Sequence, residues 1–161
     1  MQAVAVFNNL IKGNVIFTQK PHTDTVYISV QLSGFQHYVT GKPHSKHGFH
    51  IHASGDLRRG CESACDHFNP FNKPHGGLYD ENSHAGDLGN IVVDQKGCSY
   101  FSFRTNKISL FDPAKNIIGR TLIVHSDEDD LGKGGHHDSL KTGHAGKRIA
   151  CAIIGISEKT C

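Results

Sequence analysis

Two histidines, His50 and His52, have the spacing of residues on one face of a strand and could bind a metal ion. Residues 48–52 read Gly-Phe-His-Ile-His, and side chains alternate faces along a strand, so His50 and His52 project on the same side. Two imidazoles at this spacing can bind one metal ion without bending the backbone. A third can arrive from a neighbouring strand, because the strand-like run 120–125 ends at His125.

A second group of donors follows in a stretch rich in Gly, Pro and Asn. Its members are His67, His75, His84 and Asp87. Three imidazoles and one carboxylate match the four closed positions of structural zinc, whereas an all-imidazole set suits copper. The two groups together are too large for one small site, but two ions that share one histidine would use every donor. The pattern therefore predicts a two-metal centre with a histidine bridge. The alternative is that several of these histidines are ordinary surface residues.

The elements that must position these donors read as short strands. Residues 26–32 alternate apolar and polar side chains with period two, which is typical of a half-buried strand. Strands are also predicted at residues 3–7, 14–19, 48–52, 90–94, 99–105, 120–125 and 148–156. Their short lengths and regular turn signals favour an antiparallel sandwich or barrel, and no helical stripe of useful length is present.

Two long stretches, roughly 53–87 and 126–147, have little strand character. Connections of this length inside a compact domain tend to be functional. Because both flank proposed ligands, we predict a metal-holding loop and a loop that shapes a channel. No linker, repeat or low-complexity segment divides the 161 residues, so we expect residues 1–161 to form a single domain.

Charge and composition narrow the class of protein. The net charge of +2 is too slight to indicate a nucleic-acid or membrane partner. The apolar run 3–7 stops at Asn8 and has no basic leader, so it is too short for a secretory signal or a membrane span. We therefore expect a soluble, cytoplasmic protein with no membrane or nucleic-acid partner.

Several segments carry a family resemblance that extends to Ile156. They are residues 48–52, 67–70 (His-Phe-Asn-Pro), 75–77, 84–90 (His-Ala-Gly-Asp-Leu-Gly-Asn), 119–121, 129–135 and 141–151. In combination they resemble the copper/zinc superoxide dismutases of the intracellular eukaryotic type. The resemblance implies an antiparallel Greek-key β-sandwich or barrel with two long functional loops. It also implies an oxidoreductase that converts superoxide to oxygen and hydrogen peroxide with copper and zinc.

The same resemblance divides the donors between the two metals. Copper would be held by His50, His52, His67 and His125. Zinc would be held by His67, His75, His84 and Asp87, with His67 as the shared imidazolate. Asp129 would link a copper-side and a zinc-side histidine, namely His50 and His75. The alternative for Asp129 is a solvated place in the acidic run 127–130.

Catalysis is assigned by this resemblance to His67 and Arg148. The ring of His67 would take up a proton, and Arg148 would attract superoxide and dock it near copper; its alternative is a surface arginine packed on the sheet. Lys141 and Thr142 would help to line the channel. Residues 136–138 (His-His-Asp) depart from the family, which commonly has an acidic pair at the last two positions, so the extent of electrostatic steering differs.

Five cysteines leave at least one thiol unpaired. Cys61 and Cys151 match the intrasubunit disulfide of the family, and closing their 90-residue separation (151 − 61) would stabilise the fold by ~4.6 kcal/mol in the chain-entropy model. The alternative is five reduced thiols, as is usual in a reducing cytosol. Cys65 departs from the family and could compete for Cys151. Cys98 and Cys161 are expected to be structural or incidental.

Two other functions are compatible with the same fold, and the sequence also indicates a homodimer. A copper-chaperone-type or metal-storage domain could share the fold without dismutation, although such chaperone domains commonly lose a ligand or the channel arginine, and this chain keeps both. Gly55 and residues 118–119 and 154–156 resemble the surface that forms the family's homodimer. Ser54 stands where the family often has phenylalanine, so we expect a homodimer that is weaker than usual. A copper chaperone is an expected delivery partner.

Overall fold

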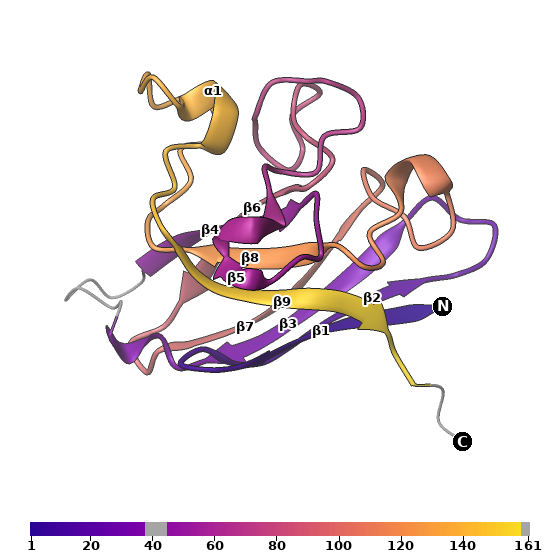
Figure 1. The fold of residues 1–161 in the computed structure, drawn as a ribbon, viewed down its shortest axis with the longest axis horizontal. Coiled ribbons are helices and arrows are strands. Elements are labelled where there is room, and N and C mark those ends of the chain that lie inside the picture. Colours follow the sequence, from indigo (N-terminus) through magenta and orange to yellow (C-terminus); the bar gives the residue numbers. More distant parts are fainter. Residues whose placement is uncertain (38–44, 159–161) are drawn as a thin grey trace.

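The computed structural model describes residues 1–37 and 45–158 and is built on eight antiparallel strands (Figure 1). These strands are β1 (Gln2–Asn8), β2 (Lys12–Gln19), β3 (Val26–Ser33), β4 (Ser45–His52), β6 (Asp87–Val93), β7 (Cys98–Thr105), β8 (Thr121–His125) and β9 (Arg148–Ile156). Their order in the sheet is β6-β4-β8-β9-β1-β2-β3-β7. Each neighbouring pair is antiparallel.

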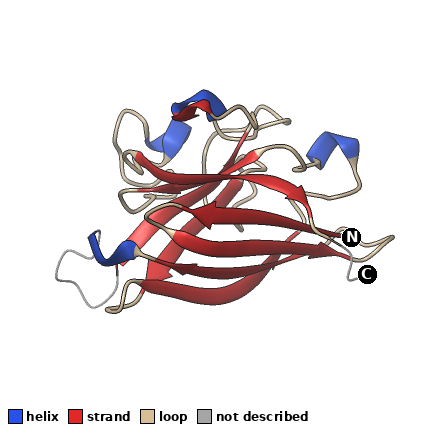
Figure 2. Ribbon diagram, turned by 60° about the horizontal axis from the view of Figure 1, so that its bottom comes forward, coloured by secondary structure: helices blue, strands red, loops and turns tan. Residues whose placement is uncertain are grey.

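The sheet curls into a nearly closed Greek-key barrel (Figure 2). β3 pairs with β7 and β4 pairs with β8, so the chain crosses between the two halves of the barrel instead of pairing each strand with the next one. The outer strands of the sheet, β6 and β7, follow each other in the chain. A tight turn joins them, and Ser99 Oγ donates a hydrogen bond to the carbonyl of Val92 across the seam at 2.8 Å. The predicted all-β fold is confirmed.

Alternating side chains fill the inside of the barrel. Along β3 the residues at every second position from Val26 to Leu32 are buried while their neighbours are more exposed. The largest fully buried side chains are Phe17, Phe35, Phe49, Ile11, Ile28, Leu32, Ile51, Ile91, Ile108, Ile117, Leu122 and Ile123. β4 and β8 depart from the alternation, since residues 47–52 and all of β8 are buried on both faces. Their outward side chains must therefore be covered by loops.

The strand pairing is irregular next to two of the histidines, His50 in β4 and His125 in β8. The register of β4 against β6 shifts between Gly48 and His50, and that of β8 against β9 shifts between Val124 and His125. Bulges of this kind re-aim a side chain and are common next to functional sites. Gly48 also allows close packing, because a Cβ at that position would lie 2.7 Å from the Cβ of Ala145.

The two predicted loops cover the outer face of β4 and β8 (Figure 1). The first loop contains a short strand, β5 (Arg58–Cys61), that the sequence did not indicate, and it ends earlier than predicted because β6 begins at Asp87. The second loop contains the one-turn helix α1 (Ser139–Thr142). The loops touch, since the backbone N–H of His75 donates to the carbonyl of Leu140 at 2.8 Å.

The eight predicted strands are confirmed, with ends that differ from the predicted ones by at most three residues. The predicted disulfide is also present: Cys61 is bonded to Cys151 and ties β5 to β9. Cys65 is exposed and Cys98 partly exposed, both as free thiols, and Cys161 lies outside the described residues. Within the described ranges, no helix has the length and apolar character that a membrane crossing requires.

Candidate metal centre

Four buried imidazoles from three segments meet at one end of β4. They belong to His50, His52, His67 and His125. One ring nitrogen of each lies within 4.8 Å of the others. β4 supplies the first two side chains, β8 the last, and the first loop supplies His67, which forms an isolated β-bridge with His52. The structure thus brings together every side chain predicted for the copper site.

Backbone hydrogen bonds hold the first loop against β4. Phe68 N–H donates to the carbonyl of Ile51 at 2.8 Å, and Ile51 N–H donates to that of Gly86 at 2.9 Å. Gly86 N–H in turn donates to the carbonyl of Phe68 at 2.9 Å. A Cβ at position 86 would lie 2.2 Å from the Ile51 oxygen, so only glycine permits this approach. The loop that carries His67 is therefore fixed relative to the strand that carries His50.

The second predicted group gathers around the carboxylate of Asp87, which is fully buried. Asp87 Oδ1 lies 2.8 Å from His67 Nδ1 and 3.2 Å from His84 Nδ1, and Asp87 Oδ2 lies 3.0 Å from His75 Nδ1. Ligand atoms about 2.1 Å from a tetrahedral ion stand roughly 3.4 Å apart. The three distances between these histidine nitrogens and the Asp87 carboxylate are therefore close to those between ligands in a zinc site. His84 stands slightly outside the tightest cluster, which His50, His67, His75 and Asp87 form.

Asp129 links the two groups from outside. Its side chain is fully buried; Oδ2 accepts from His50 Nε2 and Oδ1 from His75 Nε2, both at 2.8 Å. A carboxylate only accepts hydrogen bonds, so each ring carries its proton on Nε2 and turns Nδ1 inward. Asn90 holds Asp129 in place through two backbone contacts of 2.8 Å, donating to its carbonyl and accepting from its N–H. The side chain of Asn90 was not predicted to have this role.

Among the residues that the structure describes, five inward-facing histidine ring nitrogens have no hydrogen-bond partner. They are His50 Nδ1, His52 Nε2, His67 Nε2, His75 Nδ1 and His125 Nε2. Buried polar atoms are almost always satisfied, and one without a partner costs about 1–3 kcal/mol. Four of the five belong to the group around His50 and His52, one from each ring. His75 Nδ1, the fifth, points at Asp87 without the angle of a hydrogen bond. This donor set fits cations between the rings.

Burial lowers the pKa of three of these rings, His52, His67 and His125, and keeps them neutral. Burial first, and then the neighbouring imidazoles, lower the pKa of His67 to about 3 and that of His125 to about 2. Neutral rings offer lone pairs, which metal binding requires. His75 differs: burial acts to lower its pKa, but the hydrogen bond to Asp129 and the nearby negative charge of Asp87 outweigh burial and raise the pKa to about 9. A cation bound there would displace a proton.

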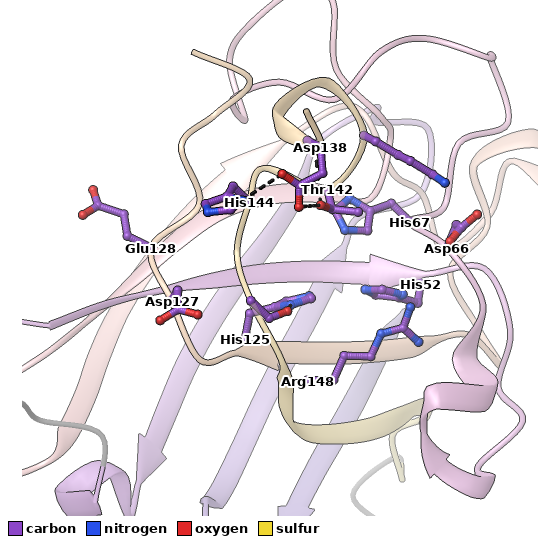
Figure 3. Close-up of a pocket in the computed structure, with 12 residues that line it drawn as sticks. His52, Asp66, His67, His125, Asp127, Glu128, Asp138, Thr142, His144 and Arg148 are labelled. Atoms are coloured by element: carbon purple, nitrogen blue, oxygen red, sulfur yellow. Dashed lines mark hydrogen bonds and ion pairs between the residues drawn. The ribbon is translucent and has the colours of Figure 1, made fainter. Parts of the chain in front are cut away.

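A cavity of about 660 Å³ opens above the first group (Figure 3). His52, His67 and His125 line it together with Arg148. The guanidinium of Arg148 is fixed by the turn after β5: Nη1 donates to the carbonyls of Cys61 at 2.9 Å and Glu62 at 3.3 Å, and Nη2 donates to that of Cys65 at 2.7 Å. A cation held in this way beside the cavity suits a small anion.

The second loop forms the opposite wall of the cavity. Lys141 and Thr142 line it as predicted, and Asp138 and His144 line it as well. Figure 3 shows His144 directed at Asp138. Of these side chains, His144 was not predicted to face the cavity. Its sequence signal is weak, because a lone histidine beside glycine in a loop is usually a surface residue.

Comparison with known proteins decides the family. Residues 11–154 match the family model described as copper/zinc superoxide dismutase. The chain belongs to the copper/zinc superoxide dismutase family. A curated superoxide dismutase [Cu-Zn] of Paramecium bursaria Chlorella virus 1 is 49% identical over 159 residues, which cover 99% of this chain and 80% of that protein.

A solved structure shares the fold of this chain. The crystal structure of a protein described as the clock protein EA4 superposes with a TM-score of 0.86 and 43% sequence identity. The match covers 97% of this chain and 94% of that one. The similarity in fold therefore extends over nearly the full length of both chains.

Proposed function

We propose that this protein is a superoxide dismutase that converts two superoxide anions to oxygen and hydrogen peroxide. The observation that carries the proposal is the set of unpaired ring nitrogens around His67, whose two nitrogens face different groups of donors. Such a shared ring is what a two-metal centre needs. We further propose that residues 1–161 act as one domain of this kind.

The residues fit both metals of the family. Copper would be held by the unpaired nitrogens His50 Nδ1, His52 Nε2, His67 Nε2 and His125 Nε2. Zinc would be held by Nδ1 of His67, His75 and His84 and by the carboxylate of Asp87. Copper would supply a one-electron redox couple, and zinc would supply a fixed positive charge beside the shared ring.

The side chains around the metals have separate tasks in this proposal. Arg148 docks the superoxide anion, because its guanidinium is fixed at the cavity by three carbonyls. His67 holds and releases a proton at Nε2, while its Nδ1 remains against Asp87. Asp129 keeps the protons of His50 and His75 on Nε2, which leaves both Nδ1 atoms free as ligands.

The test is superoxide consumption by protein loaded with copper and zinc, with metal content measured on the same sample. We expect rapid consumption in the loaded protein and none in metal-free protein. A loaded protein that passes copper to an acceptor without consuming superoxide would instead be a chaperone-type domain. A loaded protein that does neither would be a storage domain. Either of these results would reject the dismutase proposal.

The assembly and location are part of the same proposal. We expect a homodimer across Gly55, Ile118, Gly119 and the end of β9, where Ile156 is 69% exposed. Gly55 and Gly119 pack closely, because a Cβ on Gly55 would lie 2.0 Å from the Gly119 oxygen. Ser54 offers little apolar area, so the dimer should be weak; sedimentation at micromolar concentration measures it. The expected setting is the cytoplasm, with a copper chaperone as delivery partner.

A further inference from the structure

Four side chains form a second donor cluster on the second loop, at the mouth of the cavity. They are His136, His137, Asp138 and His144, and we call them the rim cluster. His144 Nδ1 donates to Asp138 Oδ1 at 2.8 Å. The rings of His136 and His144 stack with centroids 3.8 Å apart and planes 13° apart. His137 Nδ1 lies 3.8 Å from the same Asp138 oxygen.

The rim cluster has the donor types of a transition-metal site. Imidazole nitrogen with one carboxylate oxygen suits Zn²⁺ and Cu²⁺. Two ligands about 2.1 Å from an ion and at right angles to it stand roughly 3 Å apart. The 2.8 Å between His144 Nδ1 and Asp138 Oδ1 is close to that value. A cation could therefore replace the proton between these two atoms with little movement.

The remaining donors can reach the same point. The side chain of His137 is 90% exposed, so it can rotate without displacing packed atoms. His136 is also exposed and already lies against His144. The ligand atoms of the rim cluster do not all converge in the structure as those of the buried groups do. The site would thus close around an ion and bind it less tightly than the buried sites.

The backbone fixes the rim cluster relative to the buried histidines. Gly143 adopts φ 70° and ends α1 immediately before His144. A Cβ at position 143 would lie 2.0 Å from Asp129 Oδ1 and 2.5 Å from His75 Nε2, so the loop rests directly on the inner centre. Asp138 and His144 line the same cavity as His52. An ion at the rim therefore lies on an open route to the inner rings.

We propose that the rim cluster is an outer metal site that captures divalent copper at the cavity mouth before it reaches the buried histidines. The capture step rests on the proposed function, because it requires copper to be the ion of the inner site. The binding of an ion at the rim does not rest on the proposed function. It depends only on the side chains of His136, His137, Asp138 and His144.

The first experiment is a Cu²⁺ titration of protein whose buried sites are already filled, by calorimetry and electron paramagnetic resonance. We expect one further Cu²⁺ with nitrogen couplings from imidazole. His144→Asn should weaken this ion by at least about tenfold, since loss of a direct ligand should cost no less than loss of an outer partner. The matched control is His22→Asn: His22 is also exposed and also has positive φ, 60° against 51° at His144.

The result that rejects the outer site is the absence of a further Cu²⁺ in the wild type, or equal binding in wild type and His144→Asn. The second experiment follows copper uptake into metal-free protein by its visible absorption at limiting copper. Slower uptake in His144→Asn, with uptake in His22→Asn unchanged, supports capture. Equal uptake in all three proteins rejects it. The filled-protein titration needs no dismutase activity, so failure of the outer site and failure of the proposed function give different results.

Discussion

Arg148→Ile removes a guanidinium that the structure fixes at the wall of the cavity above His52, His67 and His125. Three of the five N–H donors of Arg148 are used by the carbonyls of Cys61, Glu62 and Cys65. The turn after β5 therefore sets the orientation of the group, and the remaining two donors are left for an anion. Isoleucine keeps much of the apolar stem of the side chain but has neither charge nor donor.

The size of the effect follows from these contacts. A hydrogen bond to a charged group contributes about 1.5–3 kcal/mol, and each 1.4 kcal/mol is a factor of ten. Loss of a single such bond to superoxide predicts roughly a 10- to 100-fold fall in kcat/KM. Arg148→Lys should lose less, because the charge survives while the planar fork does not. Metal content should change little, since Arg148 donates to backbone carbonyls and not to the side chains of the proposed ligands, whereas the loss of these three hydrogen bonds should lower the unfolding temperature.

The assay is superoxide consumption by pulse radiolysis or stopped flow at several salt concentrations. Arg104→Ile is the matched control, because Arg104 is exposed on β7, away from the cavity, and its loss changes net charge equally. Added salt should slow the wild type and Arg104→Ile, as the Debye length is about 8 Å at 0.15 M. Arg148→Ile should be less sensitive to salt. Full activity in metal-loaded Arg148→Ile would remove this residue from the mechanism.

Three further predictions concern the metals and the fold. His67→Ala should lower the content of both metals, whereas His84→Ala should chiefly lower zinc; elemental analysis that finds both ions at wild-type affinity in His67→Ala would rule out the bridge. Cys65→Gly should raise the unfolding free energy by about 1 kcal/mol, since Cys65 has φ 65° and ψ −158°, a region that favours glycine; calorimetry showing a lower Tm would contradict this. In metal-free protein the pKa of His125 is lowered from 6.5 to about 2, so the neutral ring contributes to the unfolding free energy fully above pH 6.5, and this contribution is lost as the pH falls. The pKa of His75 is raised to about 9, so the protonated ring contributes to the unfolding free energy fully below pH 6.5, and this contribution is lost as the pH rises through 9. Urea unfolding of the metal-free protein should therefore show greatest stability near pH 6.5, and a steady rise from pH 6 to 9 would refute the assignment.

The strands could be predicted because their signal is local. Alternation along residues 26–32 and the pair His50 and His52 depend only on the geometry of one strand. β5 was missed because its four residues, Arg58–Cys61, carry two charged side chains and a glycine and have no apolar alternation. Its position is fixed by the disulfide to β9, and a long-range bond of this kind leaves no periodic pattern in the sequence.

The proposed metal ligands could be predicted from the sequence, but the residues that hold these ligands in position could not. Nothing in the neighbourhood of Asn90 indicates that it holds the backbone of Asp129 from 39 residues away. In the same way, the bulges at His50 and His125 depend on pairing between strands that are distant in the chain. The rim cluster was visible in sequence only as a departure at residues 136–138, because His144 joins it through the turn of α1.

One carbonyl, that of Cys65, contacts both the ring of His52 and the guanidinium of Arg148. The oxygen of Cys65 accepts both from His52 Nδ1 and from Arg148 Nη2, each at 2.7 Å. It fixes His52 with its proton on Nδ1, so Nε2 faces inward, and it also orients the guanidinium. The carbonyl reaches both partners because Cys65 accepts a backbone conformation that costs about 1–3 kcal/mol. The Cys61–Cys151 bond secures the turn on one side and the strand of Arg148 on the other. Glycine at position 65 would relieve the strain and keep the carbonyl, so stability and substrate docking should respond separately to that change.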